Sequence, residues 1–262
     1  MKFIQNQDAL MNWDKQQRIY ERKAYRIIQS HLKKILNDLP INNVSETTLE
    51  YLLNGNITDE KVKAMLLEVY KTIGLDYGNK VNLTFERVKK DNILFNDGLL
   101  KEILLFLNNK GGVRITSIRS TLIDSLMQEV QAELARQGSL ISIRDVIYNI
   151  VRKSQSFYKW QALRIARTET TFASNFAAVK ASDNAGFEMV KTWIAVNDDR
   201  TRLDHVIENM QTVDSDKPFV MADGTEMMYA GDPDAPARQV INCRCTIGFE
   251  AKRDSEGMLI LK

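Results

Sequence analysis

Residues Trp193 to His205 read WIAVNDDRTRLDH, and the pattern of the chain changes at this stretch. Its first residues end a loosely alternating apolar run, Phe187 to Val196, which predicts a β-strand because strand side chains alternate between two faces. The polar run Asn197 to Arg200 predicts a turn, with Asp199 as the N-cap of a short helix that ends near Asn209. Before this stretch the apolar residues recur with a helical period, so we expect a helical part followed by a mixed one.

Downstream, the pattern predicts short strands and tight turns. Asp223-Gly224 lies between the apolar runs 218–221 and 226–229, a typical β-hairpin signal. Residues Ile241 to Phe249 predict another strand, and a final apolar strand is expected over Met258–Leu261. Together these features predict a small α+β module with a β-hairpin and a short antiparallel sheet.

The front of the chain predicts helices joined by short polar turns, which is the pattern of a helical bundle. Pro40 should end the first helix, Gly74 another, and a break is expected near Asn96-Asp97-Gly98. The fold class is therefore a mainly α N-terminal region, residues 1–153, followed by an α+β module, residues 154–262. The expected helices span residues 8–39, 45–53, 58–74, 83–109, 117–137, 142–153 and 155–184.

Composition narrows the class of protein. The chain has 262 residues, of which 44% are hydrophobic, and this is enough to bury a substantial core. Its net charge of +2, with a slightly basic front half, argues against strong binding to polyanions. No signal peptide and no apolar run of membrane-spanning length is visible, so we expect a protein made in a cytoplasm, without a membrane partner.

Three residues of the second module have side chains that commonly bind metals. They are His205 and the chain's only cysteines, Cys243 and Cys245. Residues two apart on a strand point to one face, and imidazole with thiolates is a donor set that Zn²⁺ prefers. The sequence therefore suggests a zinc site that joins two distant segments, although C-x-C is not the common C-x₂-C spacing.

Two points about this site stay open. Asp199, Asp204 or Asp214 could supply a fourth ligand. Alternatively, the cysteines are small core residues, and His205 is hydrogen-bonded to a carboxylate such as Asp198.

Many charged residues of both signs lie near His205, Cys243 and Cys245 in the sequence or in the preceding helix. They suggest a network of ion pairs that fixes the geometry of this region rather than adding stability. Arg167 and Glu169 are neighbours on a helix and point about 100° apart, so we expect each to reach a different partner in the β-rich part. No catalytic residues are assigned, because no phosphate cradle or oxyanion-type turn accompanies the cluster. The proposed network comprises Arg167, Glu169, Asp198, Asp199, Arg200, Arg202, Asp204 and Arg244.

The order of these motifs resembles the minor head proteins of tailed bacteriophages, the family named after the F head-morphogenesis protein of phage Mu. The resemblance covers about residues 160–250. The matching motifs are Arg167-Thr168-Glu169, Gly186, Lys191 with Trp193, Asp198 through His205, Asp216 with Phe219, Gly231-Asp232-Pro233, and Asn242 through Cys245.

This resemblance implies a structural protein of the virion, at the portal vertex or head interior, acting in head morphogenesis and DNA ejection. The implied partners are the portal protein, other head proteins and packaged double-stranded DNA bound without sequence preference. Some relatives carry a C-terminal toxin, and we expect no such extension after Cys245. Two alternatives remain: a DNA-binding protein of the virion, and an enzyme that uses the region of Arg167, Glu169, His205 and Cys243, with Cys243 as a thiolate nucleophile.

Overall fold

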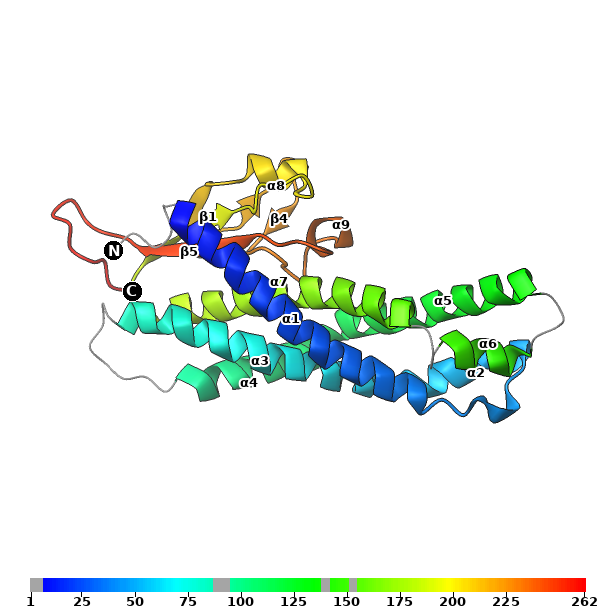
Figure 1. Cartoon of the computed structure of the whole chain (residues 1–262). Helices are drawn as coiled ribbons and strands as arrows, with labels where there is room; N and C mark the ends of the chain where they lie inside the picture. The colour runs from blue at the N-terminus through cyan, green and yellow to red at the C-terminus, as the bar shows by residue number, and fades with distance from the viewer. Residues whose placement is uncertain (1–6, 87–94, 138–141, 151–154) are drawn as a thin grey trace. The chain divides into compact units, whose positions relative to one another are not determined.

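The computed structural model describes residues 7–86, 95–137, 142–150 and 155–262, and it confirms the expected fold class (Figure 1). A largely helical front part precedes a small antiparallel sheet and a hairpin. The helical elements of the front part are α1 Gln7–Asn37, η1 Ile41–Asn43, α2 Glu46–Asn56, α3 Asp59–Glu86, α4 Phe95–Asn109, α5 Gly111–Gln137, α6 Ile143–Tyr148 and α7 Gln155–Asn184. The C-terminal elements are β1 Met189–Ile194, α8 Leu203–Ile207, β2 Thr212–Asp214, β3 Phe219–Val220, β4 Glu226–Met227, α9 Ala237–Val240 and β5 Thr246–Ala251.

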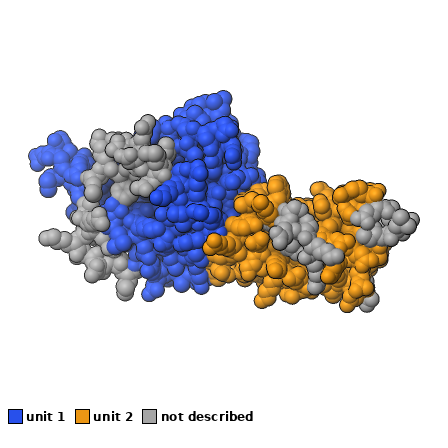
Figure 2. All heavy atoms as spheres, viewed as in Figure 1, with its two compact units in different colours: residues 1–24, 69–104, 166–262 blue, residues 25–68, 105–165 orange. Residues whose placement is uncertain are grey.

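The chain divides into two compact units, each built from separate stretches of sequence (Figure 2). Unit 1 contains Met1–Ala24, Val69–Leu104 and Ala166–Lys262, and unit 2 contains Tyr25–Glu68 and Leu105–Ile165. This grouping follows spatial contacts, whereas the expected boundary after residue 153 follows the sequence pattern. That boundary stays a prediction.

Unit 2 is a helical assembly with an aliphatic core. Leu32, Leu53 and Leu126 are among its fully or almost fully buried side chains. Ser45 begins α2 with a capping box. At the other end of α2, the Arg119 side chain donates hydrogen bonds to the carbonyls of Ile57 and Asn54, which satisfies groups that the helix leaves free.

The prediction that a helix ends at Gly74 is wrong, because α3 continues to Glu86. Within unit 1, a Cβ atom on Gly78 would lie 2.7 Å from Leu99 and 3.2 Å from the Cβ of Ala177. A Cβ on Gly74 would meet Ile103 at 3.4 Å. The two glycines therefore serve close helix packing, and they do not terminate the helix.

Other expected boundaries also move. Asn96, Asp97 and Gly98 lie in the first turn of α4, which begins at Phe95, and α5 begins at Gly111 rather than near Ser117. The expected helix end near Lys153 lies outside the described residues. None of the helices in the described parts of the chain has both the length and the apolar character needed to cross a membrane.

The sheet of unit 1 has the order β2-β1-β5, and both pairings are antiparallel. β1 is central, with Trp193 opposite Ile247 on β5 and Lys191 opposite Val213 on β2. β3 and β4 form the predicted hairpin around Asp223-Gly224. Phe219 of this hairpin is fully buried and packs edge-on against Trp193, with ring centroids 5.3 Å apart.

Three C-terminal expectations need correction. The strand expected over residues 241–249 begins only at Thr246, because Ile241 and Asn242 form a turn directly after α9. The last expected strand, 258–261, forms only isolated bridges, such as Arg253 with Leu259. The N-cap of α8 is Arg202 and not Asp199.

Candidate metal centre and the helix that positions it

One face of α7 holds the segment that carries both cysteines. Thr168, Thr171 and Asn175 are spaced three and four residues apart, so they lie on the same side of the helix. Thr168 accepts a hydrogen bond from the Asn242 backbone at 3.0 Å, and Thr171 donates to the Cys243 carbonyl. These bonds fix the backbone of the segment before β5 begins.

Asn175 completes this attachment with both ends of its amide. Its nitrogen donates to the carbonyls of Ala230 and Cys245, at 3.0 and 3.2 Å. Its oxygen accepts from the Thr246 hydroxyl and the Ile247 backbone, at 2.9 and 3.1 Å. Because Asn175 is fully buried, it satisfies backbone groups that no water reaches.

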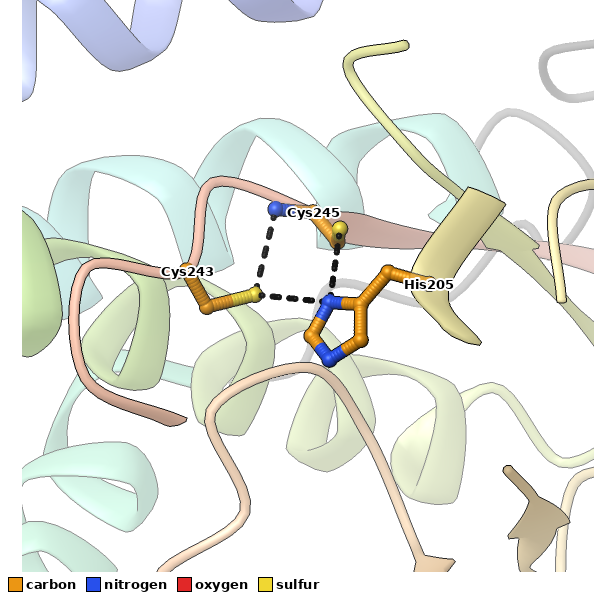
Figure 3. A group of neighbouring side chains, drawn as sticks. All are labelled: His205, Cys243 and Cys245. Atoms are coloured by element: carbon orange, nitrogen blue, oxygen red, sulfur yellow. Dashed lines mark hydrogen bonds between the residues drawn. The ribbon is translucent and has the colours of Figure 1, made fainter. Parts of the chain in front are cut away.

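The attached segment places two thiols against a histidine from α8 (Figure 3). The Nδ1 atom of His205 lies 3.4 Å from the Cys245 sulfur and 3.6 Å from the Cys243 sulfur. All three donor atoms lie within 4.8 Å of one another. The three side chains are at most 2% exposed, so the cluster is closed off from bulk solvent.

A second layer holds the histidine ring. His205 Nε2 lies 2.7 Å from the Oε1 atom of Gln239, a buried residue of α9. The Gln239 amide nitrogen donates in turn to the carboxylates of Asp204 and Asp223. Since this bonding occupies the nitrogen, Gln239 presents its oxygen to the ring, so Nε2 carries a proton and Nδ1 faces the sulfurs.

The two thiols have pKa values shifted in opposite directions. A hydrogen bond from the Cys245 thiol, together with the hydrogen bond and charge of His205, holds the pKa of Cys243 well below its usual range despite burial. The hydrogen bond to Cys243 and burial raise the pKa of Cys245 well above its usual range. Burial alone would lower the pKa of His205, but Cys243 and Gln239 outweigh burial and raise it. The cluster therefore favours ionisation of the Cys243 thiol over that of Cys245.

The predicted ligand trio thus comes together, but none of the aspartates considered as a fourth ligand belongs to the group formed by the described residues. Asp204 accepts from Gln239, and Asp214 pairs with Lys252 at 2.7 Å. Asp199 is exposed. The carboxylate expected to hold His205, Asp198, lies elsewhere, and Gln239 takes that place.

The predicted polar network is divided into separate contacts in the described part of the chain. Asp198 forms a bidentate ion pair with Arg244, and this pair lowers the pKa of the Asp198 carboxyl. The pair joins the motif Asp198 through His205 to the motif Asn242 through Cys245. Arg202 donates to the Ile241 carbonyl. Arg200 is exposed and its backbone donates to Asp198.

The partners of Arg167 and Glu169 differ from those predicted. Arg167 lies 3.5 Å from Glu21 of α1, and the carboxylate of Glu169 accepts a 2.6 Å hydrogen bond from Tyr70 of α3. These partners are on helices, so the expectation that they lie in the β-rich part is wrong. Neither residue contributes to the His205 cluster.

Sequence reasoning missed Asn175 and Gln239. The signal for Asn175 was available: three polar residues at helical spacing interrupt a helix that is otherwise rich in alanine. Gln239 carried no comparable signal, because a single glutamine in a short turn-rich segment is typical of a surface residue.

Comparison with known proteins supports the family resemblance. Residues 124–248 match the family described as Phage Mu protein F like protein. This range contains all of the motifs noted above and begins in α5, earlier than the residues from which the resemblance was inferred.

One curated relative also matches. It is the NAD(+)--arginine ADP-ribosyltransferase EFV of Enterococcus faecalis (strain ATCC 700802 / V583), 32% identical over 121 residues. The match covers 41% of this chain and 23% of that protein, so the chain spans about a quarter of the length of this relative. No solved structure gives a significant match.

Proposed function

We propose that this chain, whose residues 124–248 match the family described as Phage Mu protein F like protein, is a minor head protein of a tailed phage or prophage. In this role it acts structurally in head morphogenesis, at the portal vertex or head interior, and takes part in DNA ejection. The observation that carries the proposal is the family match over the complete series of motifs. The family match supports a role of this region in head morphogenesis, and the location within the head and the ejection step are our inference.

Several motif residues make contacts within the chain itself, which supports a structural role. Glu169, Asp198 and Arg244 bind other residues of the same chain, and Gly231 allows close approach to α7. A Cβ atom on Gly231 would lie only 3.1 Å from the Phe172 backbone nitrogen. Such residues specify one rigid arrangement, which a protein that fits into an assembly needs.

An exposed apolar surface on and just after α8 is suited to contact with another head protein. Leu203, Val206, Ile207 and Met210 recur at helical spacing and are 75%, 37%, 59% and 50% exposed. Contiguous exposed apolar residues commonly mark protein interaction sites. We assign this surface to the portal protein, the partner that the proposed location requires.

The substitution Ile207→Asp tests this contact. It should reduce co-purification with the portal protein at least tenfold, because a carboxylate would be buried in an apolar interface. The matched control is Val113→Asp on α5, where the valine is 84% exposed. Equal co-purification of both variants, with unchanged melting temperatures, would contradict the assignment.

DNA binding is a second candidate because of the charge on α1. Its basic residues Lys15, Arg18, Arg22, Lys23 and Arg26 are all exposed. Contacts of this kind with phosphates are independent of sequence and weaken steeply with salt. Retention on double-stranded DNA at low salt, lost as salt is raised, would support this role; no retention at low salt would remove it.

The enzyme alternative rests on the Cys243–His205 pair. A nucleophilic thiolate should react quickly with an alkylating reagent near neutral pH, and slow reaction would remove this alternative. The activity named for the Enterococcus faecalis relative is not carried over, since the matched part is 23% of that protein.

A further inference from the structure

We propose that His205, Cys243 and Cys245 bind one Zn²⁺ ion, which joins α8 to the segment that precedes β5. This inference concerns the residues of the cluster alone and does not depend on the proposed place in the phage head. Figure 3 shows the three side chains converging on one point from two segments that are about 40 residues apart in the sequence.

The distances within the cluster fit a tetrahedral ion. Zn–S bonds of about 2.3 Å and Zn–N bonds of about 2.0 Å, at the tetrahedral angle, separate nitrogen from sulfur by about 3.5 Å. The structure gives 3.4 and 3.6 Å for the two nitrogen–sulfur separations. The two nitrogen–sulfur separations therefore fit the ion, while the two sulfurs, which lie within 4.8 Å of each other, need to approach to about 3.8 Å to bind it together.

The chemistry of the donors selects the ion. Two thiols and an imidazole are soft or borderline ligands, typical of Zn²⁺ and unlike the oxygen ligands of Ca²⁺ and Mg²⁺. No carboxylate joins this group within the described residues. These residues supply three ligands, so a water molecule would complete the tetrahedron.

The second layer prepares the histidine for this role. Metal-bound histidines usually donate their other ring nitrogen to a protein oxygen, which fixes the ring and the tautomer. Here Gln239 Oε1 accepts from Nε2 at 2.7 Å, and the Nδ1 lone pair is left facing the sulfurs. Asp204 and Asp223 orient Gln239, so three further residues support the ligand.

Metal analysis of the untagged full-length chain, grown with added zinc, is the first test. We expect about one zinc per chain, lost in Cys243→Ser, Cys245→Ser and His205→Gln. The matched control is His31→Gln, since His31 is the only other histidine and its ring pairs with Glu68. Folded wild-type protein that stays free of metal, even after incubation with zinc, would overturn the proposal.

A spectroscopic test avoids variants that fail to fold. Replacing zinc with Co²⁺ in the wild-type chain should produce a thiolate-to-cobalt charge-transfer band and the visible bands of tetrahedral cobalt. A spectrum of six-coordinate cobalt without thiolate bands would overturn the ligand assignment. Gln239→Leu should keep these bands but weaken zinc affinity by about 10–100-fold, the usual effect of removing such a support; unchanged affinity would overturn the role of Gln239.

Zinc should also stabilise the wild-type fold. Removing the ion with a chelator should lower the melting temperature, and Zn²⁺ but not Mg²⁺ should restore it, because an ion that binds only the folded state stabilises that state. An equal response to Zn²⁺ and Mg²⁺, or none, would contradict a specific thiolate site.

Discussion

Gly231 shows how a single residue fixes two parts of unit 1 together. Its backbone has a φ of 84°, and its Cα approaches the Phe172 backbone of α7 so closely that a Cβ would lie 3.1–3.2 Å away. Gly231→Ala should lower the free energy of unfolding by about 2–4 kcal/mol, from backbone strain and overlap together. Chemical denaturation measures this loss.

Gly257 provides the matched control. It has a φ of 81°, and a Cβ there would meet nothing within 4 Å. Gly257→Ala should therefore cost only the backbone term, about 1 kcal/mol. Equal losses for the two variants would show that close approach to α7 contributes nothing.

Lys191 is a buried charge whose effect depends on pH. Its ammonium group donates to the Met228 carbonyl at 2.8 Å and lies over the Phe219 ring, while the side chain is 1% exposed. Burial lowers its pKa to about 8, against 10.5 for an ordinary lysine, although nearby carboxylates, Asp232 foremost, oppose the shift. Between these two values the unfolded chain binds more protons than the folded chain, so stability rises with pH in that window.

Lys191→Met isolates this effect. The stability of the wild type relative to the variant should rise by up to about 3 kcal/mol between pH 8 and pH 10.5, and should be flat between pH 6 and about pH 7, where lysine is protonated in both states. Denaturation at a series of pH values measures the difference. Parallel profiles for the two proteins would contradict a lowered pKa.

For single residues, the sequence identifies side chains with distinctive chemistry, but it does not show which other side chains lie next to them. His205, Cys243 and Cys245 stood out because histidine and cysteine are rare in this chain and have distinctive chemistry. Gln239 did not stand out, since its role depends on its distance from the His205 ring. That distance is set by packing between α8 and α9, which the local sequence does not encode.

At the scale of elements, the polar face of α7 determines where the C-terminal segment lies. Asn175 is its central residue, with hydrogen bonds to four backbone or side-chain groups outside its own helix. Asn175→Ala should lower the free energy of unfolding by about 3 kcal/mol or more, because several buried groups lose their partners. Asn56→Ala, which removes one hydrogen bond to the Leu52 carbonyl of α2, should cost about 1 kcal/mol. Similar costs for the two variants would contradict the central role of Asn175.

Periodicity predicted the long elements and failed at the short ones. The expected helix 155–184 matches α7, and the strand expected from Phe187 contains β1. Gly74 was misread as a helix end because a glycine that permits close packing looks the same in sequence as one that ends a helix. The strand around the cysteines was placed too early because apolar side chains also line the turn after α9.

At the scale of the molecule, the Mu F like region shares its core with the front of the chain. Trp13 donates to the Arg244 carbonyl, and Tyr70 donates to Glu169, across 231 and 99 residues of sequence. Hydrophobic patterns show which faces are buried but do not identify the partner, so these pairings could not be predicted. The helical front and the α+β end were predictable because each follows from local periodicity.

Expression of residues 154–262 alone tests the two ways of dividing the chain. This fragment lacks Tyr70, which binds Glu169, and Trp13, which binds the Arg244 carbonyl. It also lacks Gly78, which packs closely against Ala177. We therefore expect no cooperative thermal transition by near-ultraviolet circular dichroism. The full chain should unfold cooperatively under the same conditions. A cooperative transition of the fragment near that of the full chain would instead support an independent domain after residue 153.

Quantitative mass spectrometry of purified particles tests our claim that this chain is a component of phage heads. Particles from the source should be compared with and without packaged DNA, using the portal protein as the internal standard. We expect to find the chain in the particles at a few copies per portal. Its absence from both kinds of particle, while the protein is present in the producing cells, would contradict the claim.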